Sequence, residues 1–425
     1  MPSSPESLAE LVMSRRVLVL VGAGGVGKTT TAAALAVAAA RRGRRVLCLT
    51  IDPAKRLAES LGLERMSTEE QAIDPRLFDG TSAEGGVVER GDRTSAEGGV
   101  VERGDRTSAE GGVAKRGDGR PPVRGALTAM MLDTKKTFDE LVTKYSSSPE
   151  HAARLLNNKL YKYVSTSLAG TKEYMAMEKL ATVQRDPRFD LVVLDTPPTA
   201  NALDFLDAPA RLADAIDSAT IGWFVQAFET TGKLSLNLLA RSASAVLRAL
   251  GRITGGGFLE SMAEFIGELN DLFGGFKQRA AMVEASLRSP EVSFVLVTSP
   301  APPSIQEVLF FSERLESSQM PRGAFVVNRF RVPPPGAGAS PPTEKEVAGA
   351  IAARGLALGS DAPSRLVQAY RDAVSLAALD ALHVGRLVEH AARAVPVVRV
   401  PELAGDVHDI AKLGDLAETM MAGGV

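Results

Sequence analysis

The sequence predicts an α/β fold in which helices flank a mostly parallel sheet. Short apolar segments alternate with helical or turn sequence along the chain, which is typical of a parallel sheet with helices on both faces. A glycine-rich loop also joins the first apolar segment to a helix, and such sheets bind ligands at the carboxyl ends of their strands. The predicted strands cover residues 17–21, 45–51, 127–132, 190–194, 292–298, 323–328 and 396–400.

The first predicted strand, Val17–Val21, leads directly into Gly-Ala-Gly-Gly-Val-Gly-Lys-Thr-Thr at 22–30. This is the G-x-x-x-x-G-K-T pattern, whose backbone N–H groups and following helix N-terminus surround a triphosphate. Lys28 is expected to reach the β- and γ-phosphates, and the Thr29 hydroxyl to hold Mg²⁺. The alternative, a glycine-rich turn without a ligand, is disfavoured by the order strand, loop, Lys-Thr, helix. The residues expected around the phosphates are Gly22, Gly24, Gly25, Val26, Gly27, Lys28, Thr29 and Thr30.

Two aspartates end predicted strands and are expected near the phosphates. Asp195 closes the apolar run 189–195 and precedes Thr-Pro-Pro-Thr at 196–199, as in a Walker B element whose carboxylate orients the water shell of Mg²⁺. Asp52 follows the strand 45–51 and could position or deprotonate the attacking water. It could equally cap a helix that begins at Pro53, and the spacing alone does not separate these two interpretations.

Two long segments lie outside the strand pattern. Residues 79–124 contain a thirteen-residue repeat of Gly, Glu, Arg and Asp with few apolar positions, so we expect a disordered surface insertion rather than a solenoid. A tethering role is the alternative. Residues 203–288 are expected to form a helical subdomain. Its apolar stripes are typical of core but could also line a groove for a hydrophobic protein client. Further helices are expected within 134–186 and over 343–354, 362–394 and 406–421.

Composition excludes several classes of function. The net charge of −2 argues against a nucleic-acid-binding protein. Cys48 is the only cysteine and lies in an apolar strand, so no Cys cluster is available for zinc or iron–sulfur binding. The sequence shows no signal peptide and no charge-free segment long enough to span a membrane. We therefore expect a cytoplasmic protein without direct membrane insertion.

The order of these segments resembles the ATPases of the arsenite-pump (ArsA) family, which includes the eukaryotic ATPase that targets tail-anchored proteins. The resemblance rests on 22–30, Asp-Pro-Ala at 52–54, Asp-Thr-Pro-Pro-Thr at 195–199, 298–307 and Val-Val-Asn at 326–328. It implies a P-loop NTPase fold, with Asp52 serving the hydrolytic water and Asn328 reading adenine. It also implies that Val-Pro-Glu-Leu at 400–403, which contains Pro401, covers the base. The segments 50–58 and 195–206 look like a bacterial subgroup often found as paired, non-identical subunits.

Three departures from the family pattern qualify the resemblance. Ala23 stands where these loops carry a signature lysine that reaches the phosphates of a partner subunit. The cysteines that bind arsenite are missing, and so is the Cys-x-x-Cys zinc clamp of the targeting ATPase. The single phosphate loop requires dimerisation to complete a composite site. We therefore expect either a homodimer or a heterodimer with a paralogous ATPase subunit that brings its own lysine, and we do not expect arsenite transport.

Together these observations predict an ATP- and Mg²⁺-dependent ATPase that acts as a dimeric conformational switch. The alternative is a weakly hydrolysing, nucleotide-binding regulatory subunit of a heterodimeric ATPase or client-targeting chaperone. A positioning ATPase like ParA or MinD should carry a basic surface or a C-terminal membrane helix, and the acidic, weakly apolar tail 406–425 disfavours it. An iron–sulfur reductase is disfavoured by the single cysteine.

Overall fold

The computed structural model describes residues 7–51, 56–78, 125–158, 161, 162, 165, 171–196, 208, 265, 278–338, 340–391, 395–403, 405, 407 and 410–424. Three predictions lie outside the described residues, wholly or almost wholly. They concern Asp52, the repeat at 79–124 and the helical subdomain at 203–288, of which 208, 265 and 278–288 are described and all but 288 are helical.

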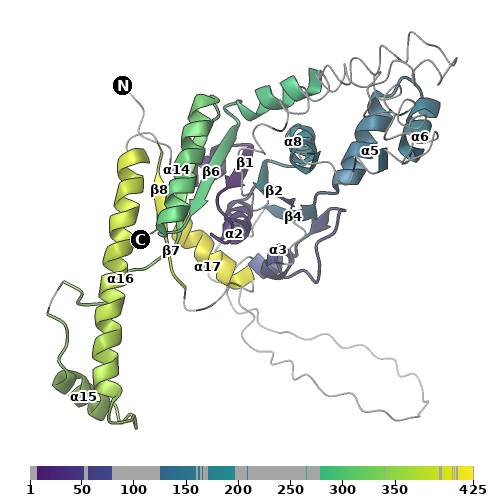
Figure 1. Cartoon of the computed structure of the whole chain (residues 1–425). Helices are drawn as coiled ribbons and strands as arrows, with labels where there is room; N and C mark the ends of the chain where they lie inside the picture. Colours follow the sequence, from purple (N-terminus) through teal and green to yellow (C-terminus); the bar gives the residue numbers. More distant parts are fainter. Residues whose placement is uncertain are drawn as a thin grey trace, which may run out of the picture.

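An eight-stranded sheet in the order β3-β4-β2-β5-β1-β6-β7-β8 forms the centre of the described part of the chain (Figure 1). Every neighbouring pair is parallel except β3 and β4. The predicted α/β class is therefore confirmed. The strands are β1 (Val17–Val21), β2 (Arg45–Thr50), β3 (Gln71–Ala72), β4 (Ala126–Met131), β5 (Leu191–Asp195), β6 (Val292–Thr298), β7 (Arg322–Phe330) and β8 (Val397–Pro401).

The seven predicted strands are all present, with ends that differ by at most two residues. The sequence did not predict β3, because two residues are too short to show any periodicity; it pairs antiparallel with β4 at the edge of the sheet. Ile51 lies just outside β2, where its N–H donates to the Asp195 carbonyl.

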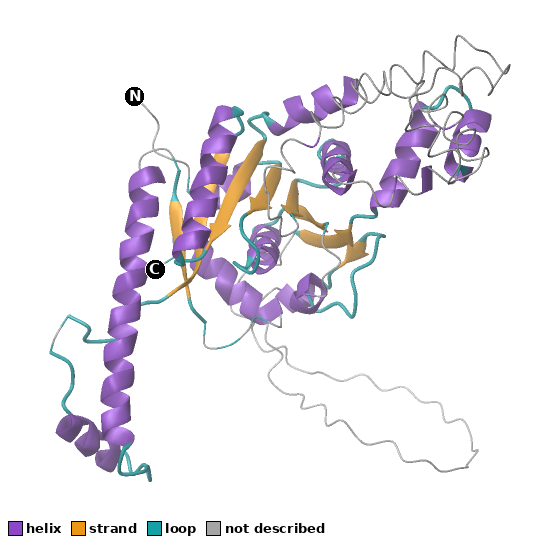
Figure 2. Cartoon of the chain, viewed as in Figure 1, coloured by secondary structure: helices purple, strands orange, loops and turns teal. Residues whose placement is uncertain are grey.

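Helices cover both faces of the sheet (Figure 2). Helices are confirmed within the predicted spans 343–354, 362–394 and 406–421, where they cover Glu344–Ala353, Ala362–Ala391 and Ile410–Met421. The span 134–186 contains three of the helices. They are α1 (Leu8–Ser14), α2 (Lys28–Arg41), α3 (Arg56–Ser60), α4 (Pro75–Phe78), α5 (Thr134–Tyr145), α6 (Pro149–Asn157), α8 (Thr171–Val183), α14 (Pro302–Ser317), α15 (Glu344–Ala353), α16 (Ala362–Ala391) and α17 (Ile410–Met421).

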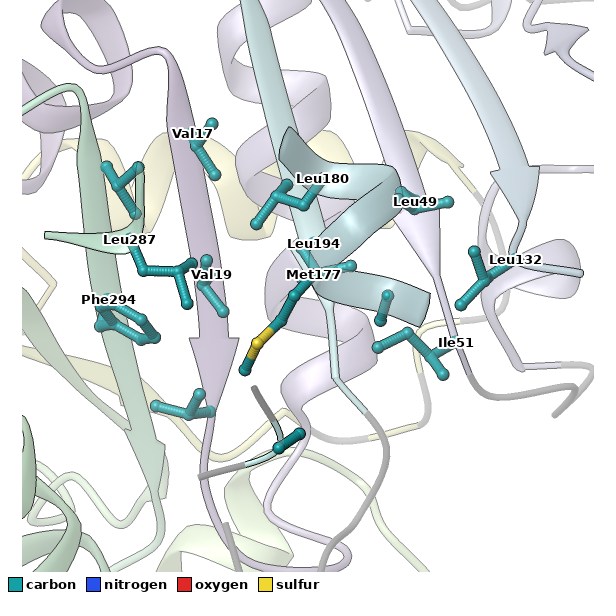
Figure 3. Close-up of a cluster of buried hydrophobic side chains, with 14 of the residues drawn as sticks. Val17, Val19, Leu49, Ile51, Leu132, Met177, Leu180, Leu194, Leu287 and Phe294 are labelled. Carbon is teal, nitrogen blue, oxygen red and sulfur yellow. The ribbon is translucent and has the colours of Figure 1, made fainter. Parts of the chain in front are cut away.

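Each face of the sheet has its own hydrophobic core, because side chains of a strand alternate between faces. Val17 and Val19 of β1 face one core, together with residues from α5, α8, α14 and α16. Figure 3 shows this core, with Met177 and Leu180 of α8 lying over the strands. Leu18 and Leu20 face the other core, which α1, α2 and α17 complete. Burial on both faces explains why the strands read as continuous apolar runs.

The central helix α2 contains alanine at half of its positions, and all residues from Thr31 to Ala40 are buried. Small side chains allow this helix to pack closely against the sheet. Its N-terminus follows β1 after the short loop 22–27. No helix of the described residues is long and apolar enough to cross a membrane.

Candidate nucleotide site

Two glycines of the loop between β1 and α2 lie too close to neighbouring atoms to leave room for a Cβ atom. A Cβ atom on Gly22 would lie 2.0 Å from the Val297 carbonyl oxygen of β6. Gly27 is the N-cap of α2 with φ = 96°, and a Cβ there would lie 2.2 Å from Nδ2 of Asn328. Gly24 and Gly25 are exposed at the tip of the loop. The backbone therefore forms a tight cradle at the N-terminus of a fourteen-residue helix, as phosphate binding requires.

Lys28 lies across this cradle. Its Nζ donates hydrogen bonds to the carbonyl oxygens of Gly22 at 2.7 Å and Ala23 at 2.8 Å, and the residue is only 6% exposed. These contacts hold a positive charge against the loop backbone, where it can meet the β- and γ-phosphates of a bound nucleotide. Thr30 follows in the first turn of α2 and is half-buried.

Asp195 and two threonines converge beside the loop. The Thr29 hydroxyl donates to Oδ2 of Asp195 at 2.9 Å, and the Thr50 hydroxyl at the end of β2 donates to the same oxygen at 3.2 Å. Asp195 is fully buried at the carboxyl end of β5, which lies between β1 and β2. Mg²⁺ prefers a hydroxyl and a carboxylate together with water and phosphate oxygens, so this donor set fits the ion.

Cys48 lies on β2 close to this carboxylate but is not available for chemistry. Burial raises the pKa of its thiol, and the negative charge of Asp195 raises it further. A thiol held neutral in this way is neither a nucleophile nor a soft-metal ligand. Among the described residues, no group of three or more His, Cys, Asp or Glu side chains could hold a metal ion.

Asn328 lies on the opposite side of the phosphate loop from Asp195. It follows the last residue of β7 that pairs with β6, and its Nδ2 donates to the Val26 carbonyl oxygen at 2.9 Å. The next residue, Arg329, has φ = 58°, an uncommon backbone conformation that accompanies a register shift between β7 and β8. Pro401 ends β8 and pairs with Phe330.

The structure brings most of the predicted site residues together. Residues 22–30, Asp195 and Asn328 are linked by the hydrogen bonds above. Pro401 lies on the neighbouring strand, two residues beyond the level of Asn328. Asp52 lies outside the described residues, although β2, which precedes it, ends beside Asp195.

Two hydroxyl contacts of the site were not predicted, although Thr196 belongs to the segment 196–199 that follows Asp195 in the predicted Walker B element. Thr50 donates to Asp195, and the Thr196 hydroxyl donates to the Leu20 carbonyl oxygen at 2.6 Å, which anchors the segment after β5 to β1. Both were detectable as polar residues that interrupt apolar strands at their carboxyl ends, because ligands of parallel sheets bind at that edge.

The site combines a mostly parallel sheet, a glycine cradle with its lysine, and a Thr29 hydroxyl that bonds the Asp195 carboxylate of the neighbouring strand β5. These features define a nucleotide-binding P-loop NTPase domain. Comparison with protein families agrees with this class. Residues 17–337, most of the chain, match the CobQ/CobB/MinD/ParA nucleotide-binding domain, and the protein belongs to this family.

Proposed function

We propose that the protein is an ATP- and Mg²⁺-dependent ATPase that acts as a dimeric conformational switch of the ArsA type. The observation that carries the proposal is the 2.9 Å contact between the Thr29 hydroxyl and Asp195, beside Lys28 and the phosphate loop. Mg²⁺ held by Thr29, with Asp195 orienting its waters, would neutralise charge on the β- and γ-phosphates. Lys28 would bind the same phosphates with its ammonium group.

Hydrolysis also needs a group that orients the attacking water. Asp52 is the residue we propose for this role, because it is two residues after Thr50, which ends β2 and donates to Asp195. If Asp52 instead caps the helix that follows, Asp52→Asn should keep most of the turnover, because asparagine is an equally good cap. A water-positioning role requires the charge, so the same variant should then lose turnover.

Two residues support adenine as the preferred base. Asn328 offers an amide beside the phosphate loop, and Pro401 offers an apolar surface on the next strand. Both resemble the adenine-contacting positions of the ArsA family, so ATP is the nucleotide we propose.

Dimerisation is proposed because the chain has one phosphate loop and Ala23 replaces the cross-subunit lysine. The Ala23 side chain is buried and its carbonyl accepts a hydrogen bond from Lys28, so this position offers no charge to a partner. A paralogous subunit with an intact lysine would supply the missing charge, worth about 10³-fold in rate by analogy with arginine fingers. Arsenite is not proposed as cargo, because Cys48 is the only cysteine and its pKa is raised. A hydrophobic protein client bound by residues 203–288 remains a proposal from the sequence.

Ala23 also favours a second candidate function, a regulatory subunit that binds nucleotide but hydrolyses it slowly. The test is ATP turnover by the purified chain over a range of protein concentrations, with Lys28→Ala as the blank. Turnover per chain that rises with concentration and disappears in the variant supports a self-sufficient homodimer. Turnover at the level of the blank, together with tight ATP binding that Lys28→Ala abolishes, supports the regulatory subunit. Absence of Lys28-dependent ATP binding would contradict both.

A further inference from the structure

Arg331, immediately after β7, joins three separate parts of the chain. Its backbone N–H donates to Oδ2 of Asp380 at 3.0 Å, and its Nη1 donates to Oδ1 of the same carboxylate at 3.1 Å. Its Nε lies 3.3 Å from Oε2 of Glu402, in the segment that follows β8. The Glu402 N–H in turn donates to the Phe330 carbonyl oxygen at 2.9 Å. One guanidinium therefore connects the ends of β7 and β8 to α16.

These contacts lie on the side of the phosphate loop that faces away from the metal site. Asp195 is on β5, to one side of β1, whereas β6, β7 and β8 follow β1 on the other side. If the terminal phosphates of a bound nucleotide lie near Asp195, its nucleoside can extend toward β6–β8 on the other side of β1. Asn328, which bonds the loop at Val26, is three residues before Arg331.

Asp380 is an unusual residue for its position on α16. It lies on a stripe of buried residues that recur at three- and four-residue steps, and it is 5% exposed. The other members of this stripe are Ala377, Val384 and Leu387. A buried carboxylate is costly unless it is paired, and here Arg331 supplies both hydrogen-bond donors. The Arg331 side chain is itself 42% exposed, so it can also reach Glu402 at the surface.

Helix α16 also carries the α15 segment away from the sheet (Figure 1). The two helices pack against each other, and α15 has no buried residue. Within α16, Asp380 lies in the half that packs on α14 and β7. A displacement of α16 would therefore disturb the contact between Asp380 and Arg331.

We propose that Arg331 is a positioning residue for the nucleoside end of the bound nucleotide. Arg331 contacts both Glu402 and Asp380, and it thereby keeps the segment Pro401–Leu403 against the end of β7. Because Asp380 belongs to α16, this arrangement depends on the position of α16. This inference rests on the proposed binding of ATP. If the contacts of Arg331 served stability alone, their loss would change the affinities for ATP and for inorganic tripolyphosphate equally.

The test compares two ligands on the purified full-length chain by titration calorimetry with Mg²⁺, namely ATP and inorganic tripolyphosphate. Arg331→Met removes both ion pairs but keeps an aliphatic stem. We expect ATP to bind about tenfold more weakly, which is the effect of losing one charged hydrogen bond, and tripolyphosphate to bind unchanged. Arg331→Lys, which restores one charge, should recover part of the loss. Arg322→Met is the matched control, because Arg322 begins the same strand and pairs with Glu316 far from the site.

The outcomes separate this inference from the proposed function. Equal weakening of both ligands, or no change in either, would overturn the positioning role while leaving Lys28-dependent ATP binding intact. Failure of the wild-type chain to bind ATP would instead overturn the proposed function. If Arg331→Met does not fold, as judged by its melting curve, Asp380→Asn and Arg331→Lys test the same ratio of ATP to tripolyphosphate affinity.

Discussion

At both the amino edge of the sheet, where its parallel strands begin, and the carboxyl edge, where they end, cationic side chains donate hydrogen bonds to backbone carbonyl oxygens. The consequences at the two edges differ. At the amino edge, Arg16 donates to the carbonyls of Gln184, Asp186 and Phe189. Arg44, just before β2, donates to the carbonyls of Val12, Arg15 and Asp190. At the carboxyl edge, Lys28 bonds the carbonyls of the loop that precedes it in sequence.

The difference lies in what the cations connect. Each arginine of the amino edge cross-links segments that are far apart in sequence, and burial lowers the pKa of Arg44 there. Lys28 donates to two carbonyl oxygens of its own loop, where glycines and a helix N-terminus prepare an anion site. We infer that the amino edge serves stability and the carboxyl edge serves ligand binding. Four predictions test this division, in order of decreasing expected effect.

The largest effect is expected at the amino edge. Arg16→Met should lower the free energy of unfolding by about 3 kcal/mol, because three carbonyls lose a charged donor. Urea denaturation monitored by circular dichroism measures this loss. The affinity of the folded variant for ATP should be unchanged. Arg45→Met is the control, since Arg45 is exposed and pairs only at the surface with Asp190. If Arg16→Met weakened ATP affinity but kept normal stability, the inference that the amino edge serves stability alone would be wrong.

At the carboxyl edge the expected pattern is reversed. Asp195→Asn should reduce Mg²⁺-dependent turnover about a hundredfold, because it removes the charge that orients the metal's waters. It should leave the melting temperature unchanged or raise it, since a buried charge becomes a neutral amide. Turnover measured against Mg²⁺ concentration should also show a higher half-maximal concentration. Thr50→Val, which removes one donor to Asp195, should have a smaller effect in the same direction. An unaltered Mg²⁺ dependence in Asp195→Asn would remove Asp195 from the metal site.

The two ends of α2 allow a comparison within a single helix. Gly27 and Gly43 have φ of 96° and 90°, but only a Cβ on Gly27 would meet a described atom within 4 Å, namely Nδ2 of Asn328. Both Gly27→Ala and Gly43→Ala should lower stability by about 1 kcal/mol through backbone strain. Gly27→Ala should also weaken ATP binding about tenfold, or about 1.4 kcal/mol, whereas Gly43→Ala should not. Equal affinities of the two variants would show that the contact with Asn328 does not shape the site.

The smallest effect concerns pH. The hydrogen bond from Arg45 holds the pKa of Asp190 at about 2, below its usual value. Because the pKa is lower in the folded state, this contribution to stability is complete above pH about 4 and is lost as the pH falls toward 2. It should amount to less than about 1 kcal/mol, since the carboxylate is 36% exposed and screened by water. Asp190→Asn should therefore flatten the decline in unfolding free energy between pH 4 and pH 3. Parallel curves for the two proteins would show that the ion pair does not contribute.

Part of the fold and of the site could be predicted because the signals are local. Each strand is a run of apolar residues, and the phosphate loop is a contiguous pattern whose glycines, Lys28 and Thr29 take their roles from neighbours in sequence. Short or irregular elements could not be predicted. Two residues of β3 carry no periodicity, and Arg329 adopts a positive φ that its residue type does not favour.

The sequence by itself determined that a phosphate loop joins a buried strand to a helix, and that strands and helices alternate around it. Only the tertiary structure decided which strands are neighbours. Thr29 and Thr50 are 166 and 145 residues from Asp195, and they meet because β5 inserts between β1 and β2. The contact of Arg331 with Asp380 and Glu402 depends in the same way on the order β6-β7-β8 and on the packing of α16. Crossover connections set the strand order. The free energy that stabilises this order comes from packing across both hydrophobic cores, so no single segment of the sequence encodes it.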